Sequence, residues 1–212
     1  MSEDLDDLDA LASLADRVRR QAYRLVADAT APVGRDEVAE ALGIGRTLAA
    51  FHLDKLVAAG LLDTSYARRS GKTGPGAGRP AKLYRVAAAE RAVSVPPRAY
   101  RTAAELLAEA LEQAGAEEVL YQVAQRHGRD ASAPSEVTEL LTAYGYAPMP
   151  DGPERIELRN CPFHRLAEQF PPVICGMNLA LITGLLAGGE WVARMEAAPG
   201  RCCVTVSKKQ SD

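Results

Sequence analysis

Four cysteines are the residues of this chain best suited to chemistry, and all lie in its last quarter: Cys161, Cys175, Cys202 and Cys203. Disulfides are uncommon in a reducing cytosol, where clustered cysteines more often bind metal or carry out redox chemistry. A single free cysteine is often only a small buried hydrophobe. The gathering of all four in one part of the chain favours a functional site.

Two of the cysteines stand where helices are expected to begin. Cys161 lies at a strand-to-helix junction, and Cys175 lies near the start of the following helix. Free backbone N–H groups and the helix dipole favour a thiolate at such places, and a thiolate can hold a soft metal or a cluster. Cys202 and Cys203 are neighbours on an expected strand, so their side chains should point to opposite faces and only one should be a ligand.

His164 follows Cys161 by three residues, a spacing that can chelate zinc. Cys161, His164, Cys175 and one terminal cysteine would then form a structural zinc site, unless His164 is an ordinary surface residue. A thiol enzyme would need a base and an orienting residue, and Cys161 with His164 is the only nearby pair. No phosphate loop or dinucleotide fingerprint accompanies it, so we do not expect an enzyme.

The elements around the cysteines predict an α+β domain over residues 99–212, after a Pro-rich linker at 93–98. We expect a small antiparallel sheet with helices on one face. The expected helices span 99–114, 116–127, 135–144, 162–169 and 173–187, and the expected strands span 146–149, 155–158, 191–196 and 201–206. The apolar stripe of the 173–187 helix (Ile174, Met177, Leu181, Leu185) is either plain core or the lining of a pocket for a small apolar ligand.

The N-terminal part predicts a winged helix-turn-helix domain over residues 13–92, preceded by an acidic disordered segment at 1–12. The expected order is helix, helix, helix, hairpin. In the third helix, residues 46–59, Ala49, Leu53 and Leu56 share one face and should pack inward. The residues left for double-stranded DNA are Arg46, Thr47, Ala50 and Lys55. His52, beside core Leu53, is expected to have a structural role.

A basic segment follows the third helix, since every charged residue between Thr64 and Arg85 is Arg or Lys. It is expected to form the wing, with Gly78-Arg79-Pro80 matching the core of AT-hook-like segments, which lie in narrow minor grooves. The candidate DNA contacts here are Arg68, Arg69, Lys72, Arg79 and Lys82. Local positive potential governs phosphate binding, so a net charge of −3 does not exclude it.

Composition places the protein among cytoplasmic proteins that do not enter a membrane. No stretch approaches the roughly 18 consecutive apolar residues of a membrane span. The acidic start of the chain is the opposite of the basic start of a secretory signal.

The third helix resembles the winged-helix repressors of the arsenic-repressor-like and DeoR-like superfamily, whose H-L-x-x-L-x-x-x-G-L pattern reads here His52-Leu53, Leu56, Gly60-Leu61. The whole chain resembles the SufR-type iron–sulfur regulators through Asn160-Cys161-Pro162-Phe163, a second cysteine about a helix later and a cysteine near the C-terminus. It departs from them in having no cysteine within residues 185–190. The α+β domain over residues 99–212 also looks loosely like small-molecule-binding domains of the vinyl-reductase type.

The SufR-type resemblance implies a homodimeric transcription regulator, typically a repressor, with a 2Fe–2S or 4Fe–4S cluster in each subunit whose redox state or loss changes operator affinity. Cys161, Cys175 and one of Cys202 and Cys203 would be its ligands. One iron would then be left for another ligand or an exchangeable molecule. The first helix and the 99–114 helix are the expected dimer interface. Such a dimer would read an inverted repeat with recognition helices about one helical turn apart.

Overall fold

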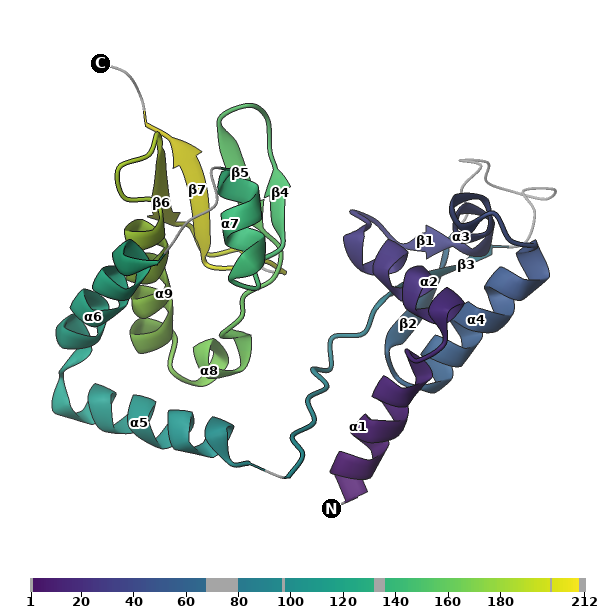
Figure 1. Ribbon diagram of the computed structural model, residues 1–212, viewed down its shortest axis with the longest axis horizontal. Helices are drawn as coiled ribbons and strands as arrows, with labels where there is room; N and C mark the ends of the chain where they lie inside the picture. Colours follow the sequence, from purple (N-terminus) through teal and green to yellow (C-terminus); the bar gives the residue numbers. More distant parts are fainter. Residues whose placement is uncertain (1, 68–79, 97, 132–135, 199, 210–212) are drawn as a thin grey trace. The chain divides into compact units, whose positions relative to one another are not determined.

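The computed structural model describes residues 2–67, 80–96, 98–131, 136–198 and 200–209, with side chains from Asp7 onward (Figure 1). The chain divides into two compact units, Met1–Arg98 and Ala99–Asp212. It is a mixed α/β protein with small sheets in which every strand pairing is antiparallel. Within the described ranges, the helices fall short of the length and apolarity that crossing a membrane requires.

The first unit contains helices and a three-stranded sheet of order β1-β3-β2. Its elements are α1 Ser2–Ser13, α2 Arg17–Asp28, β1 Val33–Gly34, α3 Arg35–Leu42, α4 Arg46–Ala58, β2 Leu62–Ala67 and β3 Ala81–Val86. Strands β2 and β3 form a hairpin in which Leu62 lies opposite Val86 and Ala67 lies opposite Ala81. The order of three helices and a hairpin after residue 16 is the order that the sequence predicted.

Local chemistry explains where these helices begin and end. Asp16 accepts a hydrogen bond from the Arg19 amide at 2.9 Å and so caps α2. The Gly34 amide donates to the Glu37 carboxylate at 2.6 Å before α3. Gly43 then ends α3 at a φ of 62°, a left-handed conformation that glycine adopts without strain. The tight turn that follows sets α4 against α2 and α3.

The N-terminal segment differs from the expectation of disorder over residues 1–12, because it forms helix α1. Ala10 is buried against the core of the first unit. Asp7 accepts a hydrogen bond from the Arg91 guanidinium at 2.7 Å, and this bond holds the pKa of the Asp7 carboxyl below its usual value. The acidic segment therefore folds as a helix because Asp7 pairs with Arg91 and Ala10 fits into the core.

The second unit joins helices to a four-stranded sheet of order β4-β5-β7-β6. Its elements are α5 Tyr100–Ala114, α6 Glu117–Asp130, α7 Val137–Ala143, β4 Pro148–Pro150, β5 Arg155–Leu158, α8 His164–Gln169, α9 Pro171–Leu185, β6 Trp191–Met195 and β7 Val204–Lys208. Helix α9 packs against β6 and β7, and α6 lies along α9 (Figure 1). Leu158, Ile182, Val204 and Val206 form the centre of this core and are fully buried.

Two glycines let α6 and α9 approach each other at backbone distance. A Cβ atom on Gly184 would lie 2.1 Å from the Gln125 carbonyl oxygen, and one on Gly128 would lie 2.4 Å from the Leu181 carbonyl oxygen. Any larger residue at either position would meet the main chain of the opposite helix. The crossing therefore depends on the absence of side chains at these two residues, and it fixes α9, which carries Cys175 near its start.

Candidate functional site

Cys202 and Cys203 do not lie on a strand as predicted, because β7 begins at Val204. Both residues belong to the turn that precedes it, and the Cys202 amide donates to the Leu158 carbonyl of β5 at 2.8 Å. The Cys203 carbonyl accepts from the Glu196 amide at 2.7 Å, so both residues still pair with the neighbouring strands. Both thiols nevertheless interact with other cysteines, so the expectation that only one takes part in the site does not follow from the strand alone.

The four cysteine side chains come together as a connected set, called here the thiol cluster. The Cys202 sulfur is hydrogen-bonded by the thiols of Cys161 and Cys203, and Cys203 is also hydrogen-bonded to Cys175. All four are free thiols. They come from the β5–α8 junction, the first turns of α9 and the turn before β7. Chain folding thus joins residues that are far apart in the sequence.

Cys202 is the acceptor at the centre of the thiol cluster. Hydrogen bonds from Cys161 and then Cys203 hold the pKa of the Cys202 thiol far below its usual value, although burial opposes this. The hydrogen bond to Cys202, followed by burial, raises the pKa of Cys161 and of Cys203. Cys202 thus accepts hydrogen bonds from two of the other cysteines and is also the most buried of the four, at 2% exposure.

A second layer of polar side chains holds the Cys202 sulfur in place. Asn178 of α9 is fully buried, and its side-chain amide donates to the Cys202 sulfur at 3.2 Å. The Tyr146 hydroxyl donates to the Asn178 carbonyl oxygen, which fixes the amide so that its N–H group faces the sulfur. Burial raises the pKa of Tyr146 and keeps it a donor. The sequence analysis missed both residues.

His164 is placed differently from the zinc-ligand hypothesis. Its side chain is 66% exposed at the start of α8, where the imidazole lies 3.3 Å from Glu168. It thus occupies the alternative position considered for it, on the surface. In the part of the chain that the structure describes, no group of three or more His, Cys, Asp and Glu side chains is arranged to hold a metal ion.

The thiol cluster offers donors of the kind that iron–sulfur clusters use, four cysteine sulfurs with an N–H donor directed at one of them. In the described residues these side chains are not arranged to hold a metal ion. The thiols are hydrogen-bonded to one another. The sulfurs must therefore separate to admit iron and sulfide. Cys161, Cys202 and Cys203 lie at a helix start and in a turn, and such segments adjust more easily than the centre of a helix.

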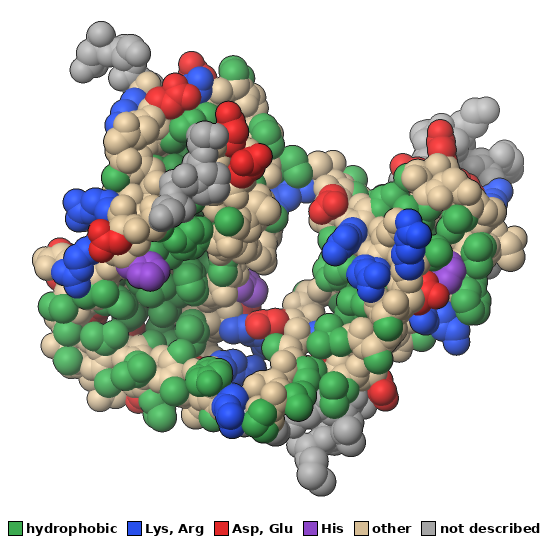
Figure 2. Space-filling view, in the orientation of Figure 1, with side chains coloured by type: hydrophobic (Ala, Val, Ile, Leu, Met, Phe, Trp, Pro, Cys, Tyr) green, Lys and Arg blue, Asp and Glu red, His purple; other side chains and the backbone are tan. Residues whose placement is uncertain are grey.

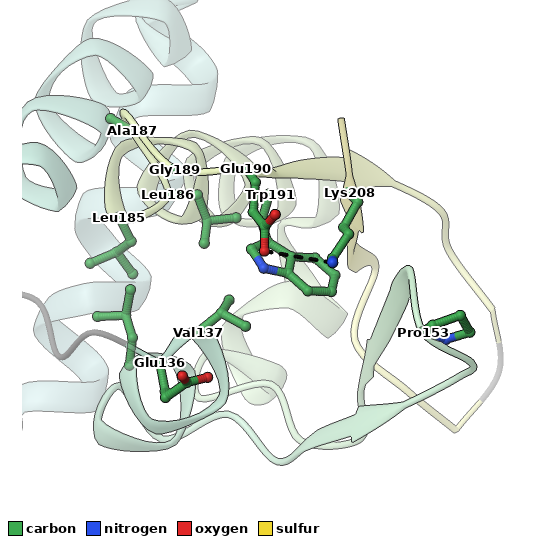
Figure 3. Close-up of a pocket in the computed structure, with 11 residues that line it drawn as sticks. Glu136, Val137, Pro153, Leu185, Leu186, Ala187, Gly189, Glu190, Trp191 and Lys208 are labelled. Atoms are coloured by element: carbon green, nitrogen blue, oxygen red, sulfur yellow. Dashed lines mark ion pairs between the residues drawn. The ribbon is translucent and has the colours of Figure 1, made fainter. Parts of the chain in front are cut away.

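A separate cavity of about 510 Å³ lies in the second unit (Figure 3). Its apolar wall consists of Val137, Leu140, Leu185, Leu186 and the Trp191 indole. The Lys208 ammonium lies 3.7 Å from the Glu190 carboxylate and 5.6 Å from the centre of the Trp191 ring. The volume suits a small molecule. Of the apolar stripe predicted on α9, Leu185 borders this cavity, whereas Ile174 and Leu181 are buried in cores.

Helix α4 presents the predicted inner face, since Ala49, Leu53 and Leu56 are completely buried. His52 is also buried, with its Nδ1 atom 3.9 Å from the Asp16 carboxylate, too far for a hydrogen bond. Sequence analysis missed two exposed apolar residues of this helix, Leu48 and Phe51. The helical spacing would have found Phe51, because it lies one turn from both Thr47 and Lys55.

The predicted DNA contacts have different surroundings in the fold. Arg46 forms an ion pair with Asp36 at 2.6 Å, Thr47 is exposed and Ala50 is half-buried. Lys55 lies over the ring of Phe51. Lys82 forms an ion pair with Asp54 at 2.7 Å and is therefore engaged within the unit. The remaining four, Arg68, Arg69, Lys72 and Arg79, lie outside the described residues.

Helix α2 adds a basic face that the sequence analysis did not assign. Arg17, Arg20 and Arg24 are exposed and recur at intervals of three and four residues, so they share one side of the helix. The sequence R-V-R-R-Q-A-Y-R already held this signal. We expect the three guanidinium groups to strengthen the positive potential of the first unit.

Comparisons with family models, with curated proteins and with solved structures find no match for this chain.

Proposed function

We propose that this protein is a DNA-binding transcription regulator whose second unit senses redox or iron–sulfur status through a cysteine-held cluster. The observation that carries the proposal is the convergence of all four cysteines into one partly buried set beside Asn178. Structural cysteines need no mutual contact, whereas a shared ligand requires it. The first unit would then transmit the state of this site to operator DNA.

The order of elements in the first unit supports the DNA-binding half of the proposal. Helices α3 and α4, joined by a tight turn and followed by the β2–β3 hairpin, follow the order of a winged helix-turn-helix. Helix α4 would be the recognition helix, with Thr47 and Lys55 on its exposed side. The arginines of α2 would contact phosphates. The basic segment between β2 and β3 would serve as the wing, which stays a prediction.

The thiol cluster supports the sensing half. Cys161, Cys175, Cys202 and Cys203 would hold the iron–sulfur cluster, which when bound supplies one-electron redox chemistry. Cys202 accepts hydrogen bonds from two of the other cysteines, and the Asn178 amide would keep donating to its sulfur. The Asn178–Tyr146 pair ties this sulfur to the core of the second unit. A change at Cys202 would therefore alter the packing of α9 against the sheet.

Helices α5 and α6 support a homodimer, because they expose apolar side chains that a monomer has no reason to present. Leu106 and Leu107 are 62% and 66% exposed, and Val119 and Val123 of α6 are exposed as well; hydrophobic side chains gather over α5 in Figure 2. A second copy of the chain is therefore the proposed occupant of this face.

Leu107→Glu is expected to convert a dimer into a monomer, because it places a charge at the centre of an apolar contact. Sedimentation velocity of the full chain measures the mass directly. Val95→Glu adds the same charge at a residue that is 83% exposed outside this face, and should leave the dimer intact. Equal masses for the parent and Leu107→Glu would rule out α5 as the interface.

The test of sensing is an ultraviolet–visible spectrum with iron, sulfide and zinc analysis on protein purified without oxygen. We expect a broad visible absorption with matching iron and sulfide. Cys202→Ser should lose most of both, because Cys202 contacts two of the other thiols. His164→Ala is the matched control and should retain them, because His164 is exposed and paired with Glu168.

Operator affinity, measured with and without the bound iron, completes this test. A difference that Cys202→Ser abolishes would support sensing, and identical affinity in both states would refute it. Colourless protein holding about one zinc per chain would instead indicate a structural zinc site. Protein without any metal after reconstitution would favour the second candidate function, a small-molecule sensor that uses the cavity between α7 and Trp191.

A further inference from the structure

Helix α4 exposes a large aromatic ring at the middle of its outer face. Its inner face consists of Ala49, His52, Leu53 and Leu56, all buried. On the opposite side Thr47, Phe51 and Lys55 follow one another at four-residue intervals. Phe51 is 53% exposed, and Leu48 beside it is 45% exposed. Burying these two side chains against a partner would gain free energy that the isolated unit leaves unused.

The Phe51 ring is held in position by its neighbours. Its centre lies 5.4 Å from that of the His52 imidazole, with the two rings edge to face. The Lys55 ammonium lies over the ring, 5.7 Å from its centre. A ring in contact with a buried imidazole and an ammonium is restrained in its orientation, which recognition of a small apolar group requires.

Cations flank the exposed apolar pair along the helix. Arg46 precedes Leu48, and Lys55 follows Phe51 by one turn. The one acid between them, Asp54, is engaged by the Lys82 ammonium at 2.7 Å and the Tyr84 hydroxyl at 2.9 Å. Arg46 is itself paired with Asp36 at 2.6 Å, so the outer face of α4 combines an apolar centre with the Lys55 ammonium at one end and this ion pair at the other.

Duplex DNA offers the complementary surface. Its major groove, about 12 Å wide, admits a helix, and thymine presents there a C5-methyl group between two rows of phosphates. A protein partner that covered Phe51 would have to desolvate Lys55 as well, at a cost that a phosphate row would offset. The geometry points to Phe51, with Leu48 beside it, as the residue that reads thymine methyl groups. This inference rests on the proposed DNA-binding function.

Uracil substitution tests this assignment, because uracil differs from thymine only by the missing methyl group. Duplexes that bind the full-length protein are first selected from a random-sequence library, and each thymine is then replaced by uracil in turn. At one or two positions per half-site we expect the affinity to fall about fourfold, the effect of one buried methyl group. Phe51→Ala should bind the thymine and uracil duplexes equally.

The outcomes separate this inference from the proposed function. Phe51 is exposed, so Phe51→Ala should keep the thermal midpoint of the parent. If Phe51→Ala retains the parent's preference for thymine, the assignment is wrong and the apolar pair serves another partner. If the parent itself selects no sequence and binds no duplex, the DNA-binding function fails as well. Val95→Ala, which shortens an exposed apolar side chain outside α4, should retain the discrimination between thymine and uracil.

Discussion

Gly184→Ala is expected to destabilise the second unit by about 1–3 kcal/mol, the usual cost of overpacking a well-packed core. The added Cβ would lie 2.1 Å from the Gln125 carbonyl oxygen and 3.1 Å from the Arg129 amide nitrogen. Both atoms are main chain, so no side-chain rotation relieves the contact. Helix α6 must move away from α9, and apolar contacts along the whole crossing are lost.

Fluorescence of Trp191 measures this effect cleanly. It is the only tryptophan of the chain and lies on β6 of the second unit, so its urea transition reports that unit even if the first unfolds separately. Gly189→Ala is the matched control, because its Cβ would meet nothing closer than 3.5 Å and its backbone is not left-handed. Equal transition midpoints for Gly184→Ala and the parent would show that the helices separate at no cost.

Sequence patterns predicted α3 and α4 well because short-range physics determines them. The apolar spacing of Ala49, Leu53 and Leu56 identified the buried face, and Gly43 marked the turn. Helix α1 was missed because its acidic composition suggests a solvated segment. Its stability depends on Arg91, a partner that lies far along the chain and cannot be found from local composition.

The sequence singled out the four cysteines as candidate site residues, but their arrangement was not predictable. The expected strand over residues 201–206 starts at Val204 in the fold, so Cys202 and Cys203 precede it. Strand ends are set by pairing partners, here β5 and β6, rather than by the strand's own sequence. Asn178 and Tyr146 carry no motif, and only the folded core brings them to Cys202.

The pair formed by Tyr146 and Asn178 should show strong energetic coupling. Tyr146→Phe removes one hydroxyl and leaves the buried Asn178 carbonyl oxygen without that donor, which costs about 1–3 kcal/mol. Asn178→Leu leaves the Tyr146 hydroxyl and the Cys202 sulfur without their partner, at a similar or larger cost. In the double variant both polar groups of the first hydrogen bond are gone, so its destabilisation should be smaller than the sum.

Urea unfolding followed by Trp191 fluorescence gives the coupling free energy, which should lie between about 0.5 and 3 kcal/mol. Tyr146→Phe combined with Thr183→Val provides the control. Thr183 is also on α9 and also loses a hydroxyl, but its hydrogen bond goes to the Leu179 carbonyl. The destabilisations caused by Tyr146→Phe and Thr183→Val should therefore be additive. If Tyr146→Phe and Asn178→Leu were equally additive, the buried amide would be satisfied independently of the tyrosine, and Tyr146 would have no part in holding Cys202.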